Sequence, residues 1–146
     1  MKRFSLMLTV LITVFFLIGA YLQGGEEKND NQSDKSKVTQ KGVIVTNNLE
    51  LDFSKHKVTF IELGADRCIP CRMMQPIMRE IAEEFAGQVQ VVFYDVWKDP
   101  KPARKYRIRL IPTQVFIDTN GKEFSRHVGF FPKKEILKLL NQKGVN

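Results

Sequence analysis

The sequence predicts an α/β fold in which a central mixed β-sheet is flanked by helices. Three observations support this class. From about residue 43 onward, β-branched and aromatic runs alternate with segments of helical periodicity. An Asn-Gly pair late in the chain predicts a hairpin, and a last amphipathic segment predicts a closing helix. Alternation followed by a hairpin and a helix is typical of helices packed on a sheet with both parallel and antiparallel strands.

The first residues form a separate piece with a different composition. Residues 4–23 carry no charge and follow a basic start, Lys2 and Arg3. This pattern fits either a secretory signal peptide or a membrane anchor, since a bilayer-spanning helix needs roughly 20 apolar residues. We therefore expect residues 1–23 to be a signal peptide or a transmembrane anchor. The two basic residues would stay in the cytoplasm, which places the rest of the chain on the extracytoplasmic, or periplasmic, side.

A polar segment separates this piece from the globular part. Residues 24–42 are glycine-flanked and nearly free of apolar side chains, which predicts a flexible linker. The remaining residues, 43–146, number roughly 100 and suffice for one modest core. We expect a monomer. The net charge is +7, but no basic run is interleaved with aromatic residues, so we expect no nucleic-acid partner.

The first half of the domain contains the clearest strand and helix patterns. Residues 43–48 predict a strand and residues 49–56 a short helix. Residues 57–65 are β-branched and aromatic, as in a central strand. In residues 70–87 the apolar side chains recur at helical spacing, and the segment closes with a glycine.

The second half continues the alternation. Residues 89–96 are apolar and predict a second central strand, and residues 100–108 predict a short helix. Residues 113–118 and 123–129 flank the Asn-Gly pair and predict the two hairpin strands. Residues 132–142 begin with proline and carry an apolar stripe, which predicts the last helix.

The chain has only two cysteines, Cys68 and Cys71, and they lie three positions apart. A loop this short makes a poor structural crosslink, which leaves metal binding or redox chemistry. Tetrahedral zinc needs four ligands, and the only histidines are His56 and His127, which lie far away in the sequence. We therefore expect no metal. In an exported protein an idle pair would simply be oxidised.

The pair is placed where a strand turns into a helix. The free backbone N–H groups and partial positive charge of a helix N-terminus stabilise a thiolate at Cys68, and Arg67 and Arg72 add positive charge. Cys71, one turn on, would then attack a mixed disulfide and release the product. Pro70 suits the first helical turn, where its missing N–H costs nothing.

Several motifs together resemble the thioredoxin family. They are CIPC followed by Pro76, then RIRLIPTQVFID, and then NGKEFSRHVGF. The resemblance covers roughly residues 43–141 and implies the thioredoxin fold. It implies that Cys68 is the nucleophile, that Cys71 is the resolving thiol and that Pro112 follows a cis peptide bond. The backbone of Ile111 would then pair with a substrate strand.

The resemblance also assigns residues around the pair. We expect Arg67, Ile69 and Pro70 to border the substrate together with Ile111 and Pro112. No metal and no cofactor beyond the Cys68–Cys71 disulfide is implied.

Glu62 falls where the family places a buried acid beneath the resolving cysteine. It shares strand parity with Val58 and Phe60, so its side chain should point inward. A buried carboxyl has a raised pKa and can relay a proton to or from Cys71. The alternative is that Glu62 is a charged residue at a strand end whose side chain reaches solvent.

The sequence departs from the family pattern at three positions. Arg67 replaces the usual tryptophan before the first cysteine, Gly64 replaces an aromatic residue, and Phe93 replaces a lysine that often partners the buried acid. These departures leave the exchange machinery but alter its surface and its proton chemistry.

We therefore expect a thiol–disulfide oxidoreductase outside the cytoplasmic membrane that reduces exported proteins, for example apocytochrome c. A membrane thiol donor would supply its electrons. Two alternatives remain open: a disulfide oxidant or isomerase that uses the same residues, and a non-catalytic adaptor that binds peptides in the groove.

Overall fold

A computed structural model describes residues 37–146. The predicted signal peptide or anchor, residues 1–23, and most of the predicted linker lie outside the described residues. Among the residues that the structure does describe, no helix combines the length and apolar character needed to cross a membrane.

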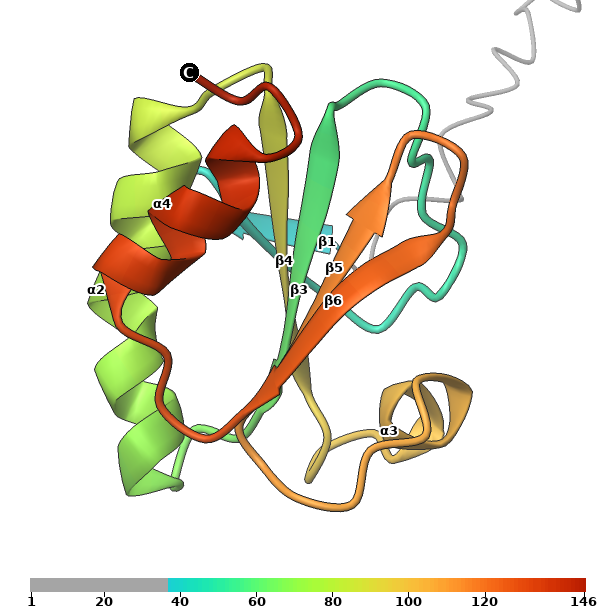
Figure 1. Ribbon diagram of the computed structural model, residues 1–146. Helices are drawn as coiled ribbons and strands as arrows, with labels where there is room; N and C mark the ends of the chain where they lie inside the picture. The colour runs from blue at the N-terminus through green and yellow to red at the C-terminus, as the bar shows by residue number, and fades with distance from the viewer. Residues whose placement is uncertain (1–36) are drawn as a thin grey trace, which may run out of the picture. The chain divides into compact units, whose positions relative to one another are not determined.

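A mixed sheet forms the centre of the domain, as the sequence predicts, and it has six strands because β1 joins the predicted ones (Figure 1). Its strand order is β1-β2-β4-β3-β5-β6. Strands β2, β4 and β3 are mutually parallel, while β1, β5 and β6 each run antiparallel to a neighbour. The strands are β1 (Lys37–Gln40), β2 (Val43–Thr46), β3 (Val58–Gly64), β4 (Val89–Asp95), β5 (Thr113–Asp118) and β6 (Glu123–Val128).

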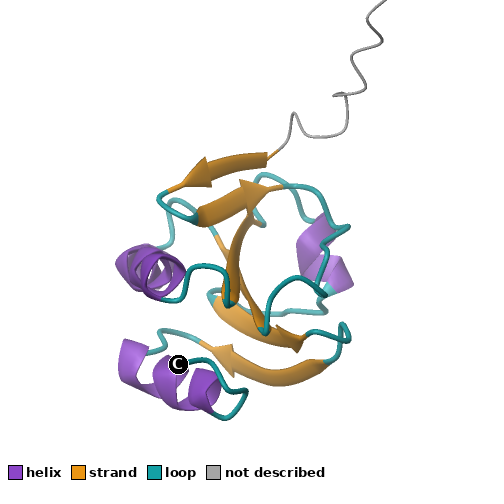
Figure 2. Cartoon of the chain, turned by 90° about the horizontal axis from the view of Figure 1, so that it is seen from above, coloured by secondary structure: helices purple, strands orange, loops and turns teal. Residues whose placement is uncertain are grey.

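Helices cover both faces of this sheet (Figure 2). Helices α2 (Ile69–Glu84) and α4 (Lys133–Asn141) pack on one face, and the short α3 (Lys101–Lys105) packs on the other. Each face therefore has its own apolar cluster. The α2 side centres on Phe60 and Phe116, whose rings stack 4.9 Å apart. Even-numbered residues of β3 point toward α2 because side chains alternate along a strand.

The predicted linker is wrong at its C-terminal end. Strand β1 lies inside residues 24–42 and pairs antiparallel with β2. Lys41 and Gly42 join the two strands with φ values of 46° and 80°, and a two-residue hairpin loop of type I′ needs positive φ at both positions. The polar composition of residues 24–42 gives no signal of this strand, which forms by hydrogen bonding to β2.

The predicted short helix at residues 49–56 is also wrong, because this segment is irregular. Its apolar residues Leu49, Leu51 and Phe53 pack on the α3-side cluster and recur every second position, which does not match the helical repeat. Asn48 and Asp52 turn the backbone locally: their side-chain oxygens accept the N–H groups two residues on, at 2.9 and 3.0 Å. The other predicted elements occur, with ends shifted by a few residues at most.

Candidate active site

The two cysteines lie at the junction of β3 and α2. Cys68 is the residue that caps α2, and its Sγ accepts the backbone N–H of Cys71 at 3.3 Å. The two sulfur atoms are bonded at 2.18 Å, and the Cα atoms are 5.2 Å apart. The first turn of α2 carries no acidic residue. The free N–H groups of this turn therefore favour negative charge on the Cys68 sulfur once the disulfide opens.

The two cysteines differ in access to solvent. Cys68 is partly exposed, whereas Cys71 is completely buried. An incoming thiolate or disulfide can therefore approach Cys68 but not Cys71. This asymmetry suits Cys68 to form the bond with a substrate and Cys71 to act only within the molecule.

Gly64 brings the sheet and the helix together at the disulfide. A Cβ added at this position would lie 3.2 Å from Cys71 Cβ and 3.3 Å from its Sγ. It would also lie 3.2 Å from Cε2 of Phe93 on the neighbouring strand. The glycine that replaces the family's aromatic residue thus lets Cys71 and Phe93 both pack closely against the backbone of residue 64.

The bond between Ile111 and Pro112 is cis, as the resemblance implies. Thr113, the first residue of β5, pairs with Leu63, so Pro112 lies just before β5 at the level of Gly64. The Pro112 carbonyl accepts the Gly129 N–H at 2.8 Å. Within the described part of the chain the Ile111 backbone makes no such bond, so it is available to a substrate strand.

Glu62 occupies the centre of the sheet and is completely buried, so its predicted inward orientation is confirmed. It is paired in register with Phe93 on β4 and with Gln114 on β5. It lies two residues before Gly64 and points to the same face, which places it roughly 7 Å further along the strand from the position that contacts Cys71.

The environment of Glu62 favours the protonated carboxyl. Burial raises its pKa to about 8, although a hydrogen bond from Gln114 lowers the pKa in part. Gln114 Nε2 donates to Glu62 Oε2 at 2.9 Å. The other oxygen, Oε1, is buried and has no partner among the described residues. At neutral pH this group therefore carries a proton on the face of the sheet that supports Cys71.

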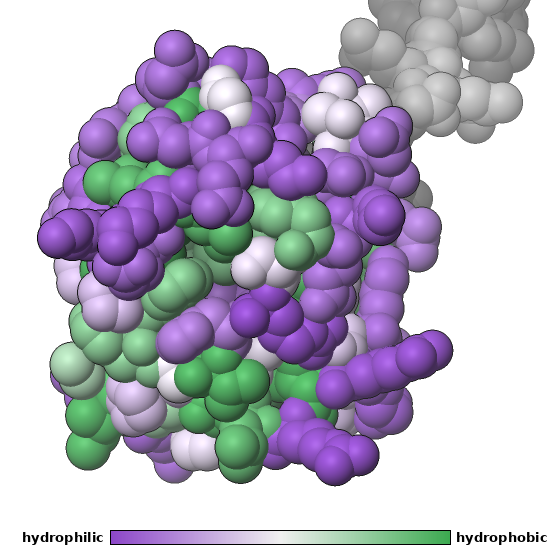
Figure 3. Space-filling model, viewed as in Figure 1, coloured by the Kyte–Doolittle hydropathy of each residue, from purple (hydrophilic) through white to green (hydrophobic). Residues whose placement is uncertain are grey.

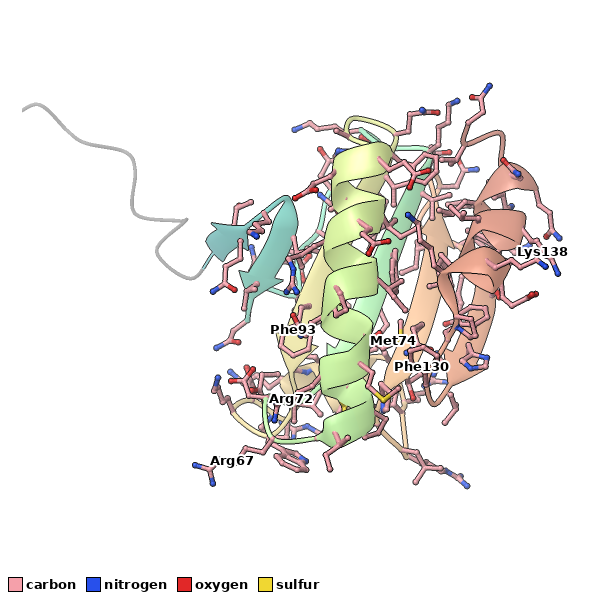
Figure 4. All side chains as sticks on the ribbon, turned by 90° about the vertical axis from the view of Figure 1, so that its left-hand side faces the viewer. Arg67, Arg72, Met74, Phe93, Phe130 and Lys138 are labelled. Atoms are coloured by element: carbon pink, nitrogen blue, oxygen red, sulfur yellow. A yellow bond between two sulfur atoms is a disulfide. The ribbon has the colours of Figure 1, made fainter. Side chains whose placement is uncertain are left out.

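Arg67, the residue before Cys68, borders a cleft of about 330 Å³, and Figure 4 shows its side chain near the start of α2. The other lining residues are Asp66, Asp95, Trp97 and Lys98. Lys98 forms ion pairs with both aspartates, whereas Arg67 forms none with any described residue. Trp97 is 62% exposed and forms an apolar wall of the cleft.

Several apolar side chains in the segments near the disulfide are exposed. Ile69, which follows Cys68, is 72% exposed, and Pro70 is also exposed. Met73 on α2, Leu110 before the cis bond and Phe130 after β6 are exposed as well. Figure 3 shows hydrophobic surface at the end of the molecule where α2 begins. All the residues predicted to border a substrate are therefore near the start of α2 or the start of β5.

The histidines do not combine with the cysteines. His127 stacks on Phe131 with ring centroids 4.0 Å apart, and His56 lies in the loop before β3. Residues 37–146 contain no cluster of three or more His, Cys, Asp or Glu side chains that could hold a metal ion.

Sequence reasoning missed Gln114, the partner of Glu62. A signal was present, because Gln114 interrupts an apolar strand two residues before the inward-facing Phe116. Only the antiparallel register of β3 and β5 shows that the two polar side chains meet.

Comparison with known proteins gives a consistent result. A family model described as Thioredoxin matches residues 40–142. The thioredoxin of Staphylococcus aureus (strain Mu50 / ATCC 700699) is 31% identical over 85 residues, which are 58% of this chain and 81% of that protein. Among solved structures, a mutant thioredoxin from Halobacterium salinarum NRC-1 superposes with a TM-score of 0.63 at 25% identity. The superposition covers 73% of this chain and 94% of that one.

We predict that Glu62→Gln stabilises the oxidised protein at alkaline pH. The folded-state pKa lies above the unfolded value, so the stability from the protonated acid is present below about pH 4.5 and is lost as the pH rises through about 8. The amide cannot ionise, so at about pH 9 the variant should have a higher free energy of unfolding, by on the order of 3 kcal/mol. Urea unfolding at about pH 5 and about pH 9 measures this difference.

Glu83→Gln, an exposed change on α2, is the matched control and should have little effect at either pH. An advantage of Glu62→Gln that is equal at both pH values would contradict the raised pKa.

Proposed function

Because this chain belongs to the thioredoxin family, we propose that it is a protein-disulfide reductase that works outside the cytoplasmic membrane. It is a thiol–disulfide oxidoreductase of the thioredoxin type. Its redox group is its own Cys68–Cys71 disulfide, without a further cofactor. As in the rest of the family, its substrates are proteins that contain disulfide bonds. The observation that carries the proposal is an accessible Cys68 joined to a buried Cys71 at a helix N-terminus.

The reaction begins from the reduced protein. The Cys68 thiolate attacks one sulfur of the substrate disulfide and forms a mixed disulfide, while the other substrate sulfur leaves as a thiolate. Cys71 then loses its proton and attacks Cys68 Sγ. The Cys68–Cys71 bond forms, and the substrate leaves as a dithiol that has gained two electrons from the cysteines. Its two protons balance the one that Cys71 releases and the one that Cys68 gave to water when it ionised.

Glu62 accepts the Cys71 proton when its carboxyl is ionised and returns a proton when a donor opens the disulfide. A group that must work in both directions needs a pKa near the working pH, and burial brings the pKa of Glu62 to about 8.

The surface around Cys68 supports a protein rather than a small molecule as substrate. The exposed Ile69, Met73, Leu110 and Phe130 offer apolar contacts, and the Ile111 backbone offers strand pairing. Proteins bind extended segments in this way because main-chain hydrogen bonds give affinity and side-chain contacts give selectivity.

The location rests on the N-terminal sequence. Residues 4–23 are uncharged and follow Lys2 and Arg3, a pattern that exports the following domain. Compartments outside the cytoplasm are oxidising, so a reductase there needs a membrane thiol donor that returns it to the dithiol state. Exported proteins such as apocytochrome c are then the proposed substrates, and the Ile69-Pro70 dipeptide between the cysteines favours reduction over oxidation.

We predict that Cys71→Ser converts the protein into a trap for its substrates. Cys68 can still attack, but no second thiol resolves the mixed disulfide. Incubation of the reduced variant with insulin should give a covalent complex that dithiothreitol releases, visible on non-reducing gels. Wild type should instead reduce the insulin and form little complex.

Cys68→Ser is the matched control, and it should form almost no complex because Cys71 is buried. Equal binding of insulin by both variants without a covalent bond would contradict catalysis and would indicate a peptide-binding adaptor.

We predict that Cys68 faces the extracytoplasmic side in cells. In intact bacteria that express the full chain, a membrane-impermeant maleimide should label Cys68 after mild reduction. A variant that lacks residues 1–36 would stay in the cytoplasm and should be labelled only after lysis. Protection of the full-length chain in intact cells would contradict the proposed location.

A further inference from the structure

A buried pair of side chains beneath the disulfide extends the proposed function, on which this inference rests. Glu62 and Gln114 are both completely buried and face each other across β3 and β5. Gln114 Nε2 donates to Glu62 Oε2 at 2.9 Å. A completely buried glutamine in a largely apolar strand has a substantial desolvation cost, which this hydrogen bond offsets only in part.

The other groups around Glu62 are apolar or belong to the disulfide. Phe93 faces it from β4 and takes the position of the lysine that the resemblance leads one to expect. Phe60 and Gly64 flank it on β3, and Cys71 of α2 packs on Gly64. Figure 4 shows Phe93 beside α2. Gln114 is thus the only described residue whose side chain hydrogen-bonds the carboxyl.

The two remaining oxygen atoms of Glu62 and Gln114 have no hydrogen-bond donor among the described residues. Glu62 Oε1 and Gln114 Oε1 are both buried without a partner in the described part of the chain. Both are acceptors when Glu62 is ionised, so neither can satisfy the other. A proton on the carboxyl turns one of its oxygens into a donor, which relieves this shortage.

We propose that Gln114 is a positioning residue that holds the Glu62 carboxyl through Oε2 and leaves Oε1 to exchange a proton with Cys71. It supplies a hydrogen bond to the acid from β5 without adding a charge, while Phe93 occupies the position of the expected lysine on β4. The hydrogen bond from the Gln114 amide favours the ionised carboxyl, whereas burial favours the protonated one. Together these two effects keep the carboxyl able to exchange its proton.

The step served by this pair is the opening of the disulfide. A donor thiolate attacks Cys68 Sγ, the Cys68–Cys71 bond breaks, and Cys71 leaves with the electron pair. Glu62 gives its proton to the Cys71 sulfur, and the carboxylate that remains keeps the hydrogen bond from Gln114. A second thiol of the donor then releases Cys68, so the donor is oxidised and the protein is reduced.

The test uses Gln114→Met, which keeps the volume and removes the amide. The charge-assisted bond to the ionised carboxyl is lost, so the pKa of Glu62 should rise, by about one unit. Carbon-13 NMR titration of the Glu62 carboxyl in the oxidised protein measures this directly. The pH profile for reduction of the disulfide by dithiothreitol should shift in the same direction relative to wild type.

Gln90→Met is the matched control on β4. Gln90 Oε1 accepts from Thr59 Oγ1 at 3.4 Å and does not contact Glu62, so the pKa and the profile should stay as in wild type. If Gln114→Met does not fold, Gln114→Asn serves instead, because its shorter side chain withdraws the donor.

An unchanged Glu62 pKa in a folded Gln114 variant would overturn the inference, and so would a shifted pKa with an unchanged pH profile. The titration and the dithiothreitol reaction need no protein substrate. If wild type fails to reduce insulin while the Gln114 variant shifts both the Glu62 pKa and the dithiothreitol pH profile, the proposed function is refuted and the role of Gln114 stands.

Discussion

The site depends on the close contact between the end of β3 and the first turn of α2. Gly64 makes this contact close, because a Cβ there would lie 3.2 Å from Cys71 Cβ and from Phe93 Cε2, and a neighbour would have to shift by a few tenths of an ångström. The contact buries Cys71 against the sheet, while Cys68 stays partly exposed at the helix cap. The difference in access between the two cysteines, which the proposed mechanism uses to assign an attacking and a resolving thiol, therefore follows from how the helix packs.

Two residues before this contact, β3 holds a carboxyl inside the sheet on the same face. Burying an ionised group without a compensating partner costs several kcal/mol of stability. Burial therefore raises the pKa of Glu62 to about 8, and the carboxyl stays protonated below that pH. The raised pKa lowers stability at alkaline pH, and in the proposed mechanism this carboxyl donates and accepts the proton of Cys71, whose sulfur solvent cannot reach. Gln114 limits the cost with one hydrogen bond, and Phe93 keeps the surroundings free of a second charge.

Residue patterns predicted the parts of the site that depend on local sequence. The strand-to-helix junction placed Cys68 at a helix start, and the parity of β3 predicted the burial of Glu62. The cis bond at Pro112 followed only from the resemblance, because local sequence rarely determines this isomer. Gln114 and β1 were missed because both depend on pairing with a partner strand, and the sequence of one segment alone does not determine the register between two strands. The segment at residues 49–56 was misread because alternate apolar residues can cover a core without forming either a helix or a strand.

The central claim is that this pair of cysteines reduces other proteins. The reduction potential of Cys68–Cys71 in the full chain, measured by equilibration with dithiothreitol or glutathione buffers, tests it most directly. We expect a value near about −270 mV or lower, as for a thioredoxin-type reductant. A value near about −120 mV would contradict the reductase, because a pair that oxidising would form disulfides in exported proteins rather than break them.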